Sequence, residues 1–302
     1  MSAIAAQRQS LRIVLPEVEL DAWLFRPAQA DDEPLPCIVM SPGFAALKAM
    51  HLDRLAERFA AAGFAVLLYD HRNFGASGGE RRGEIDPWRQ VEDMRELITW
   101  LATQAWADAT RIGLWGSSYS GGHAITLGAL DRRLRCVVAQ VPAISGYQSF
   151  LRRAGEHVQA LRAAFQADRL ARLRGAAPAY RRVIAEAGEA GIYPGSDAEA
   201  FYGFARGLSV RWENRVTLRS SERASEYEPG LLIERVSPTP LLMLVAEHDT
   251  VTPTDLALAA YQRALQPKRL VLLPGGHFDP YTVGAAQAGA EALAWFERHL
   301  RP

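Results

Sequence analysis

The sequence predicts an α/β fold, in which a mostly parallel β-sheet is flanked by helices. Short continuous apolar runs, typical of strands buried on both faces, alternate with amphipathic stretches of helical length. The joints between them are short, as in successive βαβ units. The alternation stops between about residues 146 and 235, which predicts an insertion between core strands.

Size and composition indicate a globular protein with no strong overall charge. Of the 302 residues, 49% are hydrophobic and 23% are charged, so the chain can bury a sizeable core. The 34 basic residues balance 34 acidic ones, and the absence of a net field argues against nucleic acid or a membrane surface as a partner. No stretch reaches the roughly 18 apolar residues that span a membrane, and the N-terminus lacks a leader pattern. We therefore expect a cytoplasmic protein.

The first part of the chain predicts a pair of edge strands followed by strands of a parallel sheet. Pro16 separates two short apolar stretches, as a turn between edge strands would. Gly63 stands where a glycine commonly ends a helix. The predicted elements are, in order, edge strands within 11–26, a strand at 37–41, a helix at 51–62, a strand at 65–70, a helix at 88–104 and a strand ending before residue 118.

After residue 118 the pattern continues, breaks and then resumes. The predicted core elements are a helix at 119–130, strands at 134–141, 240–245 and 269–273, and helices at 253–265 and 281–300. Between them, helical stretches at 150–173 and 178–190 with no clear buried strand predict a mostly helical cap. The expected organisation is a core of residues 1–145 and 236–302, eight strands in all, with a cap of residues 146–235.

Residues 111–122 run from a short apolar strand through a Gly/Ser-rich corner into a helix. Such a corner exposes the hydroxyl of Ser118 above the sheet, which is the geometry of a nucleophile elbow. Gly116, Ser118 and Ser120 occupy the three fixed positions of the pattern Gly-x-Ser-x-Gly, with serine in place of the last glycine. Small residues are needed there because the turn packs backbone against backbone.

A serine nucleophile needs a base, and the base needs an acid to hold it. Asp249 follows the strand at 240–245, and His277 follows the strand at 269–273. The order Ser118, Asp249, His277 is the order of nucleophile, acid and base in elbow-containing hydrolases. All three follow strands of one parallel sheet, so they are expected at the same edge. The side chains that compete for these roles are Glu247, Asp255 and His248.

Acyl transfer also needs two donors for the developing oxyanion. The N–H of Tyr119, directly after the nucleophile, is the first candidate. The second is expected in the loop after the strand at 37–41, where the N–H of Phe44 is preferred, although the identity of the donor within Pro42–Phe44 stays open.

Other polar and aromatic residues have mainly structural interpretations. His51, His71 and His123 are expected on helix faces or in loop hydrogen bonds, and no His/Cys spacing indicates a metal site. The arginines of residues 146–235 are interpreted as a solvated face. Only some of the cap aromatics are expected to face a substrate, the candidates being Tyr193, Phe201, Tyr202 and Trp212.

Four motifs together resemble a known superfamily. They are Gly-x-Ser-Tyr-x-Gly-Gly around Ser118, Asp-His-Arg-Asn-Phe-Gly-x-Ser at 70–77, Pro-Thr-Pro-Leu-Leu before Asp249, and Gly-His-Phe-Asp-x-Tyr at 276–281. The chain resembles α/β hydrolases of the dienelactone-hydrolase and X-prolyl-dipeptidyl-peptidase-like superfamily, including fungal polyketide transferases. The resemblance implies the α/β-hydrolase fold and acyl chemistry through a serine ester, with no metal or organic cofactor.

The expected function is that of a serine hydrolase acting on a small-molecule ester or related acyl compound through Ser118. An acyltransferase, or a hydrolase of carbon–carbon or amide bonds, would use the same residues. The non-enzymatic alternative is a ligand receptor built on this fold. A receptor needs no catalytic triad, so the presence of Ser118, Asp249 and His277 argues against it. The substrate and the oligomeric state, a homodimer included, stay open.

Overall fold

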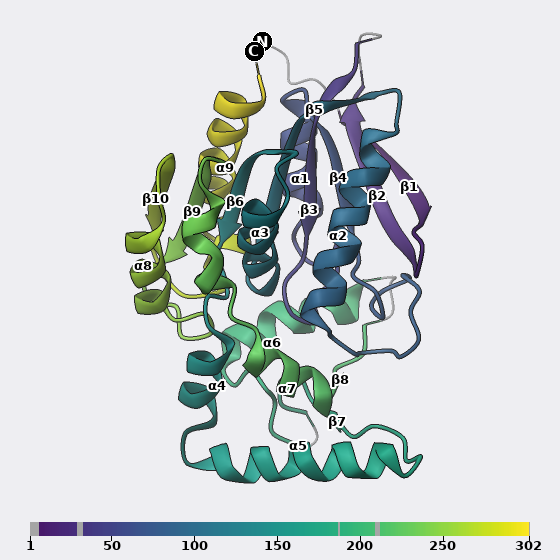
Figure 1. Cartoon of the computed structure of the whole chain (residues 1–302), viewed down its shortest axis with the longest axis vertical. Coiled ribbons are helices and arrows are strands. Elements are labelled where there is room, and N and C mark those ends of the chain that lie inside the picture. Colours follow the sequence, from purple (N-terminus) through teal and green to yellow (C-terminus); the bar gives the residue numbers. More distant parts are fainter. Residues whose placement is uncertain (1–5, 29–32, 187, 209–211, 302) are drawn as a thin grey trace.

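The computed structural model describes residues 6–28, 33–186, 188–208 and 212–301. Residues 1–5, 29–32 and 302 of the predicted core, and 187 and 209–211 of the predicted cap, lie outside this description. An eight-stranded sheet runs through the molecule in the order β1-β2-β4-β3-β5-β6-β9-β10 (Figure 1). The strands are β1 (Ala6–Val14), β2 (Glu19–Pro27), β3 (Leu35–Ser41), β4 (Ala65–Tyr69), β5 (Ala107–Ser117), β6 (Leu134–Gln140), β9 (Leu241–Ala246) and β10 (Lys268–Leu273).

The predicted mostly parallel sheet is confirmed. Strand β1 pairs antiparallel with β2, and β2 pairs antiparallel with β4, whereas the remaining neighbours are parallel. The central strands β3, β4 and β9 are apolar along nearly their whole length and are buried on both faces, as expected for strands covered by helices. The parallel strands therefore present their carboxyl ends at one common edge.

Helices cover both faces of the sheet. Helices α1 (Asp53–Ala61) and α9 (Ala285–Leu300) contribute to one apolar core, which includes Phe59 and Phe296. Helices α2 (Pro87–Ala102), α3 (Tyr119–Leu130) and α8 (Thr254–Arg263) contribute to the core on the other face. Local signals set their ends: Asp86 caps α2 through the N–H groups of residues 88 and 89, and Gly63, with φ of +99°, follows α1.

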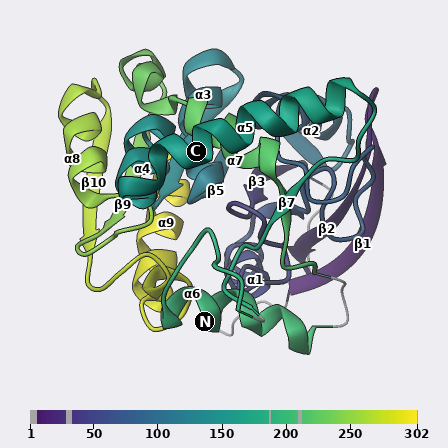
Figure 2. The same ribbon diagram turned by 90° about the horizontal axis from the view of Figure 1, so that it is seen from below.

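The chain between β6 and β9 forms a separate group of elements at the carboxyl end of the parallel strands (Figures 1 and 2). Its helices are α4 (Gly146–Ala154), α5 (Val158–Leu173), α6 (Ser196–Gly203) and α7 (Leu218–Glu226), and its short strands are β7 (Tyr180–Arg181) and β8 (Val216–Thr217). It also contains 3₁₀ segments at Gly155–His157, Phe204–Gly207 and Pro229–Val236. Two hydrogen bonds tie this group to the loop after β3: Tyr202 Oη donates to Phe44 O at 2.8 Å, and Trp212 Nε1 donates to Ala45 O at 2.8 Å.

Two of the helices predicted in this segment need correction. The predicted helix at 150–173 is two helices, because Gly155 adopts φ of +51° between α4 and α5. The predicted helix at 178–190 is wrong, since this stretch contains β7 and irregular chain. There, Asn214 Oδ1 accepts the backbone N–H groups of Val183 and Ile184 at 3.1 and 2.9 Å, so a distant side chain takes the place of helical acceptors.

No helix within the described ranges is long and apolar enough to cross a membrane.

Candidate active site

Ser118 lies on a strained corner between β5 and α3. Its backbone has φ of 55° and ψ of −117°, outside the regions that a non-glycine residue prefers. Its N–H donates to Gln140 O at 2.8 Å, which fixes the corner against the end of β6. Gly116 allows the close packing, because a Cβ there would come within 1.9 Å of Ser120 O. The strain therefore presents the hydroxyl of residue 118 at the sheet edge.

Three side chains from three strand ends meet at this corner. His277 Nε2 lies 2.9 Å from Ser118 Oγ, and His277 Nδ1 lies 2.7 Å from Asp249 Oδ2. Each of the three residues is buried, with 7% or less of its surface exposed. The competing residues lie elsewhere: Glu247 and His248 are exposed, and Asp255 pairs with Arg152.

The Asp249 carboxylate is held by its own loop. Oδ1 accepts the backbone N–H groups of Val251 and Thr252 at 2.8 and 2.7 Å, and Thr252 Oγ1 lies 2.9 Å from Oδ2 and 3.2 Å from His277 Nδ1. The sequence interpretation missed Thr252. Its signal was a hydroxyl three residues after a candidate catalytic acid, a spacing at which Asp and Thr commonly form local turn hydrogen bonds.

The two expected oxyanion donors lie beside Ser118. Tyr119 is the first residue of α3, so its N–H has no acceptor within the helix and lies at the positive end of the helix dipole. The loop after β3 packs directly on the corner, since a Cβ on Gly43 would lie 2.8 Å from Ser118 Cβ. The rings of Phe44 and Tyr119 pack edge to face, with centroids 5.4 Å apart.

The buried histidines outside this group make structural contacts. His123 lies between Gln90 Oε1, 3.0 Å from Nε2, and Tyr227 Oη, 3.1 Å from Nδ1. Burial lowers the pKa of His123 well below its usual value, so the ring is neutral. Among the described residues, no cluster of three or more His, Cys, Asp or Glu side chains could hold a metal ion.

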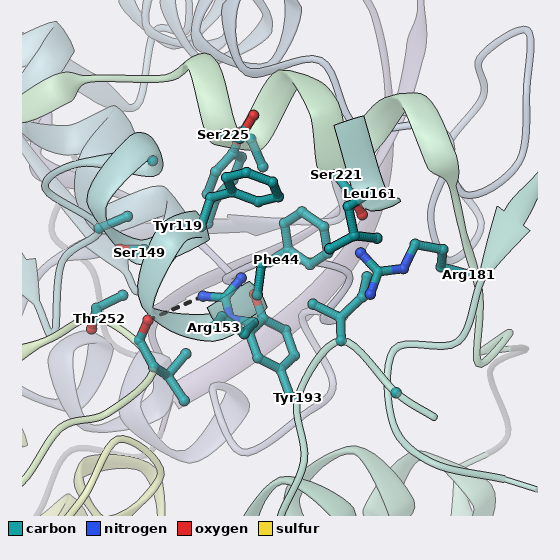
Figure 3. A pocket seen from close by; sticks show the side chains of 18 of the residues that line it. Phe44, Tyr119, Ser149, Arg153, Leu161, Arg181, Tyr193, Ser221, Ser225 and Thr252 are labelled. Atoms are coloured by element: carbon teal, nitrogen blue, oxygen red, sulfur yellow. Dashed lines mark hydrogen bonds between the residues drawn. The ribbon is translucent and has the colours of Figure 1, made fainter. Parts of the chain in front are cut away.

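A cavity of about 350 Å³ opens above Ser118 and is roofed by residues between β6 and β9 (Figure 3). Of the four candidate aromatics, Tyr193 lines it. Phe201 packs on Phe278 with centroids 4.9 Å apart, while Tyr202 and Trp212 bond to the loop after β3. The other residues that line the cavity include the titratable side chain of His157 and are otherwise mainly apolar or hydroxylated: Phe44, Tyr119, Phe150, Leu161, Ile192, Tyr227, Val251, Ser145, Ser149, Ser221, Ser225 and Thr252.

The interpretation of the arginines of residues 146–235 as a solvated face is wrong for Arg181, whereas Arg153 is exposed, as that interpretation predicts. Arg153 and Arg181 line the cavity, and Arg181 is half-buried. Others agree with that interpretation: Arg169 pairs with Glu222, and Arg182 pairs with Glu186 and Glu189. Arg181 ends β7 and Arg182 follows it in an isolated bridge to Gly191, so their side chains point to opposite sides of the extended chain.

Comparison with known proteins gives similarity along nearly the whole chain. The sequence pattern of the X-Pro dipeptidyl-peptidase (S15) family matches residues 17–279. The thiohydrolase of Eupenicillium brefeldianum is 32% identical over 96% of this chain and 94% of that protein, and polyketide transferase grgF of Penicillium sp is 31% identical over 93% and 92%. The crystal structure of α/β hydrolase GrgF from Penicillium sp. sh18 superposes with a TM-score of 0.82 at 28% identity, over 98% of this chain and 99% of that one. The structure of DcsB complexed with its substrate analogue gives a TM-score of 0.83 at 27% identity, over 98% and 100%.

Proposed function

Because the chain belongs to the X-Pro dipeptidyl-peptidase (S15) family and is a serine hydrolase of the α/β-hydrolase fold, we propose that it cleaves a small-molecule ester or thioester through an acyl-enzyme on Ser118. The observation that carries this proposal is the unbroken series of contacts from Ser118 Oγ to His277 to Asp249, at 2.9 and 2.7 Å. These are hydrogen-bond distances for a nucleophile, its base and the group that orients the base.

In the first step, Ser118 Oγ attacks the acyl carbon while His277 Nε2 accepts the hydroxyl proton. Asp249 holds Nδ1–H and stabilises the imidazolium that forms. The N–H groups of Tyr119 and Phe44 stabilise the oxyanion. His277 then gives the proton to the leaving group, and the carbonyl re-forms as the acyl-enzyme. A water molecule, deprotonated by His277, resolves the ester and regenerates Ser118.

The lining of the cavity favours an acyl substrate over a peptide with a free N-terminus. A dipeptidyl-peptidase must bind the terminal ammonium of its substrate, which calls for a carboxylate. The described residues that line this cavity include Arg153 and Arg181 but no Asp or Glu. The relatives named thiohydrolase and polyketide transferase support a thioester as one form of the substrate.

The segment of residues 146–235 acts in this proposal as a cap that sets the shape of the acyl site. Support comes from its share of the lining, which includes Phe150, Leu161, Ile192 and Tyr193. The Tyr202 hydrogen bond to Phe44 O also connects this segment to the loop expected to bind the oxyanion. Residues 1–145 and 236–302 supply the core and the reacting groups.

Acyl transfer is the second candidate. It is favoured by the relatives named polyketide transferase and acyltransferase, and it differs only in the nucleophile that resolves the acyl-enzyme. Product analysis with a thioester and an added alcohol or amine separates the two: free acid indicates hydrolysis, and a new ester or amide indicates transfer.

We also expect the protein to act in the cytoplasm. This expectation is supported by two buried free thiols, those of Cys37 and Cys136. A homodimer is the assembly to be tested, by light scattering of the purified protein.

The experiment that tests the proposal combines labelling with kinetics. A fluorophosphonate should form an adduct that peptide mapping assigns to Ser118 and not to Ser117 or Ser120, both of which are 0% exposed. Ser118→Ala should lower kcat for a p-nitrophenyl ester by at least about 10⁴-fold, while the unfolding midpoint shows that the variant is folded. Full activity of Ser118→Ala would refute the proposal.

A further inference from the structure

Arg181 lies in the cavity with no acidic partner among the described residues. It belongs to β7, is half-buried and lines the same cavity as Ser118. Burial, and next the positive charge of Arg153, lower the pKa of Arg181 from its usual value. Within the part of the chain that the structure describes, no ion pair involves this guanidinium. Partial removal of a cation from water costs free energy, which a bound anion would offset.

Arg153 lies near Arg181 and adds a second positive charge. It comes from the last turn of α4, donates to Val251 O at 3.2 Å and stacks over the ring of Tyr193 at 5.0 Å. Figure 3 shows both guanidinium groups facing the cavity, Arg181 beside Leu161 and Arg153 beside Tyr193. These contacts hold Arg153 in place while leaving most of its five N–H donors for a ligand.

The sequence neighbours of both arginines are paired with carboxylates outside the cavity. Arg152 forms two hydrogen bonds to Asp255, at 2.6 and 2.7 Å. Arg182 bonds to Glu189 at 2.8 Å and Glu186 at 3.1 Å. Both of these pairs lie at the surface, whereas the cavity lining contains no Asp or Glu among the described residues.

Ser221 adds a polar atom on the same side of the cavity. Its Oγ is buried and has no hydrogen-bond partner among the described residues, and Figure 3 places it beside Leu161 and near Arg181. Arg181 and a free hydroxyl thus lie together, Arg153 adds its charge from beside Tyr193, and the apolar lining includes Phe44 and Leu161.

We propose that Arg181 and Arg153 bind a carboxylate at the far end of the acyl chain, so that the preferred substrate is a half-ester or half-thioester of a dicarboxylic acid. This inference rests on the function proposed above. The apolar walls accommodate the methylene chain between the two ends, and the guanidinium groups match the planar carboxylate by paired N–H donors. Ser221 Oγ donates a further hydrogen bond to the same anion.

A phosphate on the leaving group could supply the same negative charge. The volume of about 350 Å³ favours the acyl carboxylate, because it is near the lower end of the range for ligand pockets, roughly 300–1,000 Å³. It fits one acyl chain and leaves little space for a phosphate-bearing arm as well.

The test compares acyl esters that differ only in their far end. The substrates are mono-p-nitrophenyl esters of dicarboxylic acids from adipate to sebacate, each paired with the alkanoyl ester of equal chain length. At the best length, wild type should prefer the anionic ester, and Arg181→Gln should lower the ratio of anionic to neutral kcat/KM by roughly 10-fold to 100-fold. Arg181→Lys should restore part of the ratio, since it keeps the charge but not the planar fork.

Two matched controls remove a neighbouring arginine instead. Arg182→Gln and Arg152→Gln change the net charge equally but act outside the cavity, so the ratio should stay that of wild type. A further experiment compares two thioesters of the same neutral acyl chain, one of phosphopantetheine and one of uncharged pantetheine, which differ only in the phosphate on the leaving group. The proposal would be overturned if Arg181→Gln lowered kcat/KM for the phosphopantetheine thioester relative to the pantetheine thioester and left the ratio of anionic to neutral acyl esters unchanged.

The outcomes separate this inference from the function on which it rests. Equal rates for anionic and neutral esters in both wild type and Arg181→Gln, with Ser118 still labelled by the fluorophosphonate, would refute the carboxylate site and leave the hydrolase intact. Loss of labelling and of all ester cleavage in wild type would refute the proposed function itself.

Discussion

The Ser120 hydroxyl lies 2.8 Å from His71 Nε2 and donates to the Pro42 carbonyl at 2.5 Å. Because that hydroxyl proton is used on Pro42, Ser120 Oγ accepts from Nε2–H of His71. The serine in place of the last elbow glycine thus connects three loops: the elbow, the loop after β4 and the loop that leads to Phe44. This gives the departure from the Gly-x-Ser-x-Gly pattern a physical role.

Ser120→Ala tests that role. The methyl group fits, but Pro42 O loses a buried hydrogen bond, so the free energy of unfolding should fall by about 1–3 kcal/mol. The Pro42–Phe44 loop should also become less well fixed, which should lower kcat more than it changes KM. Urea unfolding and ester kinetics measure both. Exposed Ser10→Ala should stay within about 0.5 kcal/mol of wild type, and equal behaviour of the two variants would count against the network.

The same network predicts a pH dependence of stability. Burial lowers the pKa of His71 from 6.5 to about 4. In the unfolded chain the ring protonates below about pH 6.5, whereas the folded protein resists protonation until about pH 4. The stability associated with neutral His71 is therefore complete above this window and is lost as pH falls through it, by about 3 kcal/mol in all.

The measurement is the slope of unfolding free energy against pH in wild type and in His71→Gln. Asp70, which is also buried, and His123 contribute to the slope in both proteins, so the difference isolates His71. The variant should show the smaller loss between pH 6.5 and 4. Exposed His157→Gln, with 75% of its side chain in solvent, should match wild type. A slope in His71→Gln as steep as in wild type would contradict the assignment.

Asp249→Asn should reduce kcat by about 10⁴-fold. Oδ1 of Asp249 accepts two backbone N–H groups, so the Asn oxygen should take that place and its NH₂ should face His277 Nδ1. That contact favours the imidazole tautomer with the proton on Nε2, which cannot accept the proton of Ser118. The variant should retain its fold and its unfolding midpoint within a few degrees, as measured by circular dichroism.

The competing acids and base supply the controls for this variant. Asp255→Asn, Glu247→Gln and His248→Gln alter residues that are exposed or paired with Arg152. Each should leave kcat within about twofold of wild type, since surface changes away from the site are usually small in effect. A large loss in any of them, with activity retained in Asp249→Asn, would reassign the acid.

The sequence was sufficient for the core because local signals and topology agree there. The Gly/Ser corner between an apolar strand and a helix predicted α3 from Tyr119 to Leu130. The positions of Asp249 and His277 after strands predicted their meeting, because parallel strands end at one edge. In these regions each signal depends on residues only a few positions apart.

The segment above the site could not be predicted in the same way. The backbone at 183 and 184 is held by Asn214, about thirty positions away, which no helical periodicity can reveal. Similarly, Arg152 and Arg153 are adjacent and chemically identical, yet one pairs with Asp255 and the other faces the cavity. Only the packed structure separates a solvated arginine from one that is available to a ligand.

Gly43→Ala should lower kcat/KM by about 100-fold, the effect expected when reacting groups shift by about 1 Å. A Cβ at residue 43 would lie 2.8 Å from Ser118 Cβ and 3.3 Å from Ser118 Oγ, so either the Gly43–Phe44 loop or the nucleophile must move. Movement of the loop displaces the Phe44 N–H from the oxyanion, and movement of Ser118 lengthens its contact with His277. Gly203→Ala is the matched control, because nothing lies within 4 Å of the added methyl group. Steady-state kinetics with one neutral ester compares the two variants. If Gly43→Ala were as active as Gly203→Ala, this loop could not supply an oxyanion donor, and the second donor would have to be sought elsewhere around Ser118.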